Sequence, residues 1–243
     1  MKPLLRWLAL VLLAALALEL FFVLRIASMA AIAPESTAFQ RSEAWRIAST
    51  RHRLPWAQQW VPYDRIADTL KRAVIASEDD NFVNHDGVDW DAVEQAWQKN
   101  AAAEARAAQR PNASSAQARA PKIRGGSTIT QQLAKNLLLS GERTLLRKGQ
   151  EFVLTLALEA CLPKQRILEV YLNNVEWGEG VFGAEAAARH YFGKSAAQLN
   201  AAESARLAVM LPAPKRFEKT PGSAYLAGRS RTILARMGSA ELP

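Results

Sequence analysis

Cysteine is almost missing from this chain of 243 residues, which contains Cys161 alone. A single cysteine excludes an intramolecular disulfide framework and any zinc or iron–sulfur site built from several cysteines. Histidine is also scarce, since only His52, His85 and His190 occur and none has the HExxH spacing of a zinc protease. The sequence therefore argues against a disulfide scaffold and a zinc protease.

A nucleotide-binding Walker A loop is absent as well. The only Gly-Lys-Ser run begins at Gly193, and Ala188 stands where the leading glycine of that motif belongs. The composition is 49% hydrophobic, which is enough for a core, with 31 Lys+Arg against 23 Asp+Glu and a formal charge of +8. This charge names no partner by itself, because nucleic acid, anionic lipid and pyrophosphate all attract cations.

One long apolar run does occur, close to the amino terminus. Trp7 to Leu24 is eighteen residues with one charge, Glu19. At about 1.5 Å per residue, the run spans roughly 27 Å, close to the ~30 Å hydrocarbon core of a bilayer. We interpret residues 1–33 as a transmembrane anchor with a short cytoplasmic end. A cleaved signal peptide is the alternative, because Ala31-Ile32-Ala33 fits a cleavage site, although the run exceeds the usual 7–15 residues.

Helical patterns dominate the rest of the chain. Residues 34–63 are more polar, contain Pro55 and Pro62, and are interpreted as a connector with one short helix. Apolar residues at helical spacing follow in Ile66–Ser77, Gln132–Leu139, Leu145–Leu162, Lys164–Leu172 and Ala201–Leu211. No hairpin or alternating strand run stands out. We therefore expect a mostly α-helical domain over residues 64–243.

Residues 98–122 interrupt this pattern. They are rich in Ala, Gln, Arg and Ser, contain two prolines and have no apolar stripe. The segment is expected to be a mobile loop. Its basic residues could contact anionic headgroups or substrate phosphate, or the loop could simply be solvated.

Two polar motifs flank that segment. The first runs from Ser77 to Gly87 and contains three consecutive acids beginning at Glu78. Such neighbours repel one another unless exposed or paired, and one with a raised pKa could act as a general base. The second runs from Arg124 to Asn136, where Gly125-Gly126-Ser127-Thr128 leads into a helix whose free amides can bind an anion.

A third motif, Arg147-Lys148-Gly149-Gln150-Glu151, places Arg147 and Glu151 four residues apart on a predicted helix. An intrahelical ion pair is the simplest interpretation. The alternative is that the cations meet a phosphate while Glu151 contacts a reacting hydroxyl or a bound cation. The spacing does not decide between these interpretations.

Taken together and in order, the motifs between about Arg65 and Pro214 resemble the bacterial peptidoglycan glycosyltransferases of the lysozyme-like superfamily. The resemblance rests on five blocks: Glu78-Asp79-x-x-Phe82-x-x-His85-x-Gly87, Gly126-Ser127-Thr128-Ile129-x-Gln131-Gln132-x-x-Lys135-Asn136, Arg147-Lys148-x-x-Glu151, Ile167-Leu168-Glu169-x-Tyr171-Leu172-Asn173 through Trp177-Gly178-x-Gly180, and Glu203-x-Ala205-x-Leu207-Ala208 leading to Pro212. The resemblance implies a lysozyme-like, two-lobed domain.

The implied reaction polymerises lipid II into β-1,4-linked glycan strands, inverts the donor carbon and releases polyprenyl pyrophosphate. Matching the motifs makes Glu78 the general base and Glu151 a second carboxylate that organises the donor site. The implied substrate-binding residues are Asp79, Phe82, His85, Ser127, Thr128, Gln131, Gln132, Lys135, Asn136, Arg143, Arg147 and Lys148. The side chains of Leu168, Tyr171, Leu172 and Trp177 are expected to pack in the core or groove, and Glu203 to be a buried or capping partner.

The same resemblance gives the setting. The expected partners are lipid II, the growing glycan strand, membrane lipid and proteins of cell-wall synthesis and division, without nucleic acid. Mg²⁺ or another divalent cation could share the pyrophosphate charge, with ligands the sequence does not identify, and no organic cofactor is expected. The domain would lie on the periplasmic side of the bacterial inner membrane. A transpeptidase domain is not expected, because the nearest match to its Lys-Thr-Gly signature is Lys219-Thr220-Pro221.

Two other classes of function remain open from the sequence. A lytic transglycosylase or lysozyme-type hydrolase could use Glu78 as a general acid on finished glycan. A non-catalytic membrane scaffold would tolerate replacement of Glu78.

Overall fold

The computed structural model describes residues 2–108, 126–139, 141–142 and 144–243. The chain is mostly α-helical, as expected, with short 3-10 turns and strands between the helices. The five segments with helical apolar spacing are confirmed as α3 (Asp68–Glu78), α5 (Ile129–Leu138), α6 (Leu145–Cys161), α7 (Lys164–Asn174) and α9 (Ala201–Met210). Their buried faces meet in one core, because each presents its apolar stripe to the others.

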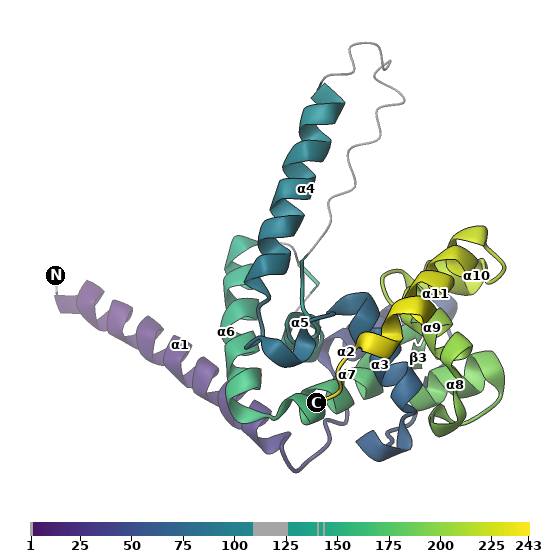
Figure 1. Cartoon of the computed structure of the whole chain (residues 1–243). Coiled ribbons are helices and arrows are strands. Elements are labelled where there is room, and N and C mark those ends of the chain that lie inside the picture. Colours follow the sequence, from purple (N-terminus) through teal and green to yellow (C-terminus); the bar gives the residue numbers. More distant parts are fainter. Residues whose placement is uncertain (1, 109–125, 140, 143) are drawn as a thin grey trace.

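The apolar run forms α1 (Lys2–Ser28), which is long and apolar enough to cross a membrane. Figure 1 shows it projecting from the body, and its side chains are exposed over most of its length. Only its last turns pack against α6, where Ile26 is buried. Exposed leucines along an isolated helix are stable in hydrocarbon rather than in water.

The expected connector contains a longer helix than predicted, α2 (Ala38–Arg51). Thr37 caps it and Ile47 is buried in the body, while Gln40 donates hydrogen bonds to Asn174. The helix also packs against α5. Residues 38–51 are therefore part of the folded body, because an apolar residue and a capping box fix them there.

The expectation of a loop from residue 98 is wrong for its first eleven residues. Residues 98–108 continue α4 (Trp90–Ala108), which Figure 1 shows as a rod leaving the body. Alanine is the strongest helix former, so an Ala-rich segment without an apolar stripe still extends a helix that has already begun. Residues 109–122 of the expected loop lie outside the described part of the chain.

The structure contains a small three-stranded sheet that the sequence analysis did not predict. Strands β2 (Glu176–Gly178) and β3 (Val181–Phe182) form an antiparallel hairpin, and β1 (Ala57–Gln58) pairs with β3 in parallel. Strands of two or three residues are too short to show a period of two. The sheet fixes residue 176 beside the helices of the site.

The remaining helices complete the body around α3 and α9. They are η1 (Tyr63–Arg65), η2 (Phe82–Asn84), α8 (Ala184–Phe192), η3 (Ala196–Gln198), α10 (Pro214–Lys219), α11 (Ala224–Arg236) and η4 (Met237–Ser239). Helices α3 and α11 both pack on α9. Glu203 confirms its expected capping role, since it forms a capping box with Asn200 at the start of α9.

Candidate active site

The carboxylate of Glu78 lies at the carboxyl end of α3, where that helix meets α5 and α7. Its Oε2 accepts a hydrogen bond from the Gln132 side-chain nitrogen at 3.0 Å. The Gln132 oxygen in turn accepts one from the Tyr171 hydroxyl, also at 3.0 Å. Because the tyrosine hydroxyl donates to the amide oxygen, the amide nitrogen is directed at Glu78.

The environment of Glu78 suits a base. Burial raises the pKa of the Glu78 carboxyl, the hydrogen bonds from Gln132 and Ser77 oppose that increase, and the charge of Asp79 adds to it. Burial also raises the pKa of the Tyr171 hydroxyl well above its ordinary value, so this group stays a donor. A carboxylate with a raised pKa is a stronger base than one in water.

The next acid, Asp79, forms hydrogen bonds within the fold. It is buried, accepts a hydrogen bond from the backbone nitrogen of Ile129 at 2.9 Å, and has its other oxygen 2.9 Å from His85 Nε2. His85 Nδ1 accepts from the Gly87 nitrogen, so a neutral His85 ring donates through Nε2 to Asp79. Asp79 therefore joins the first motif to the start of α5.

Gly87 makes the second link between these motifs. Its carbonyl accepts a hydrogen bond from Thr128 Oγ1 at 2.6 Å. Its φ is +87°, and a Cβ atom here would lie 2.7 Å from Thr155 Cγ2. Glycine is required at this turn, because a side chain meets both backbone strain and a steric clash.

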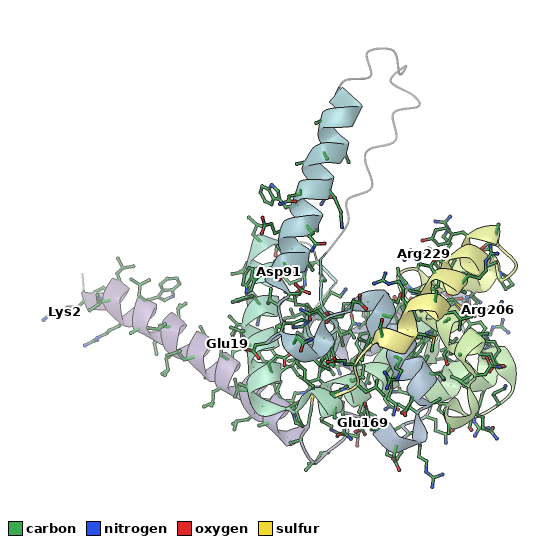
Figure 2. All side chains as sticks on the ribbon, in the orientation of Figure 1. Lys2, Glu19, Asp91, Glu169, Arg206 and Arg229 are labelled. Carbon is green, nitrogen blue, oxygen red and sulfur yellow. The ribbon has the colours of Figure 1, made fainter. Side chains whose placement is uncertain are left out.

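Glu78 and Gln132, which are joined by a hydrogen bond, line two different cavities. Glu78 lines the first, the Glu78 cavity, of 520 Å³, together with Ser127 and Thr128 of the second motif. Asp91 also lines it, and Figure 2 shows this residue near the end of α4 that joins the body. Gln132 lines the second, the Lys135 cavity, of 740 Å³, together with Lys135, Asn136 and Arg147. The hydrogen bond between Glu78 and Gln132 thus connects the linings of both cavities.

Glu151 is buried beneath its neighbours on α6. Arg147 Nη1 lies 2.7 Å from its Oε2, and Lys148 contacts its Oε1. The intrahelical ion pair expected from the spacing is therefore present. The buried carboxylate holds Arg147, a residue that lines the Lys135 cavity, in one place.

The predicted site residues fall into groups. Glu78, Gln132, Ser127, Lys135, Asn136 and Arg147 line the two cavities, as do Asp79 and Thr128, which also carry hydrogen bonds of the fold. His85 borders a third cavity with Trp90 and Phe152. Lys148 is half exposed and contacts Glu151. Arg143 lies outside the described part of the chain.

Phe82 and Gln131, two of the predicted substrate-binding residues, line neither of the two cavities. Phe82 has no exposed surface, and Gln131 is buried with its side-chain oxygen used in the capping box of α5. Burial of the apolar Phe82 ring in the core stabilises the fold through the hydrophobic effect. Phe82 thus belongs to the core and Gln131 to the cap of α5.

Two residues of the site were missed by sequence reasoning. Tyr171 was expected to pack, as its burial confirms, but its hydroxyl reaches Gln132. Glu176 lines the Lys135 cavity from β2. Helical spacing marked Tyr171 as apolar core and gave no signal for Glu176.

Comparison with known sequences places this geometry in a family. A model of the transglycosylase family matches residues 46–238. The chain belongs to the transglycosylase family. This match confirms the resemblance inferred from the five motifs. Glu78, Gln132 and Arg147 all lie within the matched region.

Named relatives extend the likeness over the whole chain. A protein of Paraburkholderia xenovorans is 52% identical over 98% of this chain and 94% of its own length. A protein of Herminiimonas arsenicoxydans is 50% identical over 100% of this chain and 99% of its own length. A protein of Burkholderia thailandensis is 51% identical over 94% of this chain and 83% of its own length. Each is named a biosynthetic peptidoglycan transglycosylase. The similarity includes the apolar helix α1, since the alignments cover nearly the full chain.

Proposed function

We propose that this transglycosylase polymerises lipid II into β-1,4-linked glycan strands and has no transpeptidase activity. Membership of the family supports an enzyme that transfers glycosyl groups in peptidoglycan synthesis. The observation that carries the finer proposal is the hydrogen bond from Gln132 to Glu78, which joins a cavity containing a base to a cavity lined by Lys135 and Arg147.

The proposed step is a single inverting displacement. Glu78 takes the proton from the 4-hydroxyl of the acceptor sugar, and that oxygen forms a bond to C1 of the donor sugar. The bond between C1 and the pyrophosphate oxygen breaks, and polyprenyl pyrophosphate leaves with the bonding electrons. An inverting reaction needs a base on one face and assistance to the leaving group on the other.

Cations supply that assistance. Pyrophosphate is a good leaving group whose developing charge requires stabilisation more than protonation. Arg147, held by Glu151, and Lys135 lie on the Lys135 cavity and support this role, with Lys148 close by. We assign the donor pyrophosphate to this cavity and the acceptor sugar to the Glu78 cavity.

A resident metal ion does not fit the residues present. The described part of the chain has no group of three or more His, Cys, Asp or Glu residues placed to hold one. Mg²⁺ or another divalent cation is therefore proposed only as a companion of the substrate pyrophosphate, and no step is derived through it.

Helix α1 supports action at a membrane. By length and composition it can span a bilayer, which would hold the active site near a lipid-linked substrate. We propose that the protein is a single-pass protein of the bacterial inner membrane with its catalytic domain on the periplasmic side.

The test is incubation of the detergent-purified full chain with labelled lipid II, followed by gel analysis of polymer. We expect polymer from the wild type and a loss of about 10² to 10⁴-fold in rate for Glu78→Gln, the contribution typical of a general base. Asp64→Asn is the control, since it removes an exposed carboxylate from η1, the turn that precedes the same helix. Cleavage of finished peptidoglycan without polymer formation would identify a lytic enzyme instead.

A further inference from the structure

One buried carboxyl in the Lys135 cavity has no part in the step above. Glu176 of β2 is 7% exposed and lines that cavity. Its Oε1 is buried and makes no hydrogen bond within the described part of the chain. The nearest cation is Lys215 of α10, whose Nζ lies 3.4 Å from Oε1. A buried polar atom without a hydrogen bond costs free energy unless a ligand satisfies it.

The cations near Glu176 are shared with a second carboxylate. Glu43 of α2 forms ion pairs with Lys215 and, at 2.8 Å, with Arg46. Lys215 therefore divides its charge between Glu43 and Glu176. Among the described residues, the other titratable groups that line the cavity are Arg41 of α2, Lys135 of α5, Glu142 and Arg147 of α6, and the charge of Glu176 also acts on Tyr191 of α8.

This environment brings the carboxyl close to neutrality. Burial raises the pKa of Glu176 to about 7, and the charge of Glu43 adds to the effect, while Lys215 and Arg46 oppose it. Near neutral pH the group therefore exists in both forms. At Glu43 burial is again the largest single effect, but the hydrogen bonds and the charges of Arg46 and Lys215 together outweigh it and lower the pKa of that carboxyl.

We propose that Glu176 binds the donor substrate as a neutral carboxyl that donates a hydrogen bond to an oxygen of the anionic pyrophosphate group. An ionised carboxylate in the same place would repel an anion held by Lys135 and Arg147, whereas a neutral carboxyl is a donor. The inference rests on the proposed function, because it assigns the pyrophosphate to this cavity.

Proton linkage gives the sign of the effect. A bound anion favours the neutral form of Glu176, so affinity is highest below pH 7 and falls as the carboxyl ionises. If only the neutral form binds, affinity decreases roughly tenfold per pH unit above the pKa, and at pH 8.5 the neutral fraction is about 3%. A carboxyl that does not face the bound anion gives no such decrease in affinity above pH 7.

The experiment measures binding of inorganic pyrophosphate to the detergent-purified full chain by calorimetry at pH 6.0 and pH 8.5. The probe changes its own protonation equally for every variant, so the ratios between variants report on the protein. We expect the wild type to lose roughly thirtyfold more affinity between the two pH values than Glu176→Gln, whose amide donates at both. The control, Glu179→Gln, removes an ion-paired carboxylate from the same hairpin outside the Lys135 cavity and should follow the wild type.

A second variant covers the case in which Glu176→Gln does not fold. Lys215→Met removes the charge that lowers the pKa of Glu176, so the loss of affinity should begin at higher pH than in the wild type. Three results would each overturn the inference. One is equal pH dependence of binding in the wild type and Glu176→Gln, and another is a loss of affinity that begins at the same pH in Lys215→Met as in the wild type. The third is that the wild type does not bind pyrophosphate. Failure to make polymer while these binding differences hold would count against the proposed function alone.

Discussion

The Tyr171 hydroxyl donates a hydrogen bond to the Gln132 side-chain oxygen at 3.0 Å. This contact orients the amide whose nitrogen donates to Glu78. The tyrosine lies on α7 and the glutamine on α5, so the orientation of the proposed base depends on the packing of two helices against the end of α3.

Removal of that hydroxyl should weaken catalysis. Tyr171→Phe leaves the ring in place, but Gln132 is no longer directed at Glu78. Loss of about 1 kcal/mol corresponds to a polymerisation rate lower by roughly five- to tenfold. The hydrogen bond from Gln132 lowers the pKa of Glu78, so its weakening should also move the acid limb of the rate profile to higher pH.

Tyr191→Phe is the control for this prediction. Its hydroxyl donates a hydrogen bond to the backbone carbonyl of Trp177 in β2 at 2.7 Å, and not to Gln132. Its loss should leave the acid limb in place. An unchanged limb in Tyr171→Phe would contradict the proposed orientation of Gln132.

Arg147 and Glu151 should be energetically coupled. Their contact of 2.7 Å involves a carboxylate with a 4% exposed side chain. Single substitutions Arg147→Met and Glu151→Gln should each lower the free energy of unfolding, and the double-mutant cycle should give a coupling of about 1–3 kcal/mol. Chemical denaturation of the detergent-solubilised protein measures it, and additive effects would show that the ion pair does not fix Arg147.

Two glycines should respond in opposite ways to alanine. Gly87→Ala places a Cβ 2.7 Å from Thr155 Cγ2 at a positive φ, and should destabilise the protein by about 2 kcal/mol or more. Gly149→Ala lies within α6 with no atom within 4 Å of the new Cβ, and should stabilise by about 0.5–1 kcal/mol. Thermal unfolding of both variants checks the prediction; equal effects would contradict the required turn at Gly87.

The function of α1 as an anchor can be tested by intact mass spectrometry and by alkaline extraction of membranes. Protein purified from the membrane fraction should retain residues 1–33, whereas a cleaved signal would leave a shorter chain in intact mass spectra. Leu13→Arg near the middle of α1 should cost about 3–4 kcal/mol of insertion free energy and increase the share of protein released by alkaline extraction. Leu13→Ala is the control and should remain in the membrane.

Local sequence determined the helices and the apolar segment. Apolar spacing identifies which face of a segment is buried, and length with few charges identifies a possible span. The same reasoning failed where the signal is short or absent: the strands of the hairpin have two or three residues, and residues 98–108 extend α4 through alanine propensity alone. Apart from the intrahelical ion pair of Arg147 with Glu151, the site residues named from the motifs were placed by order and type, without their contacts.

The sequence by itself therefore determined the mostly α-helical class, the apolar helix and the family whose motifs include Glu78 and Arg147. Tertiary structure alone decided which side chains of different helices meet. Glu78 and Gln132 are 54 residues apart, and Tyr171 and Gln132 are 39 apart. Periodicity reports burial within one element, whereas these contacts depend on how α3, α5 and α7 pack. For the same reason, the nearly neutral carboxyl of Glu176 follows from burial beside a shared Lys215, which no local pattern encodes.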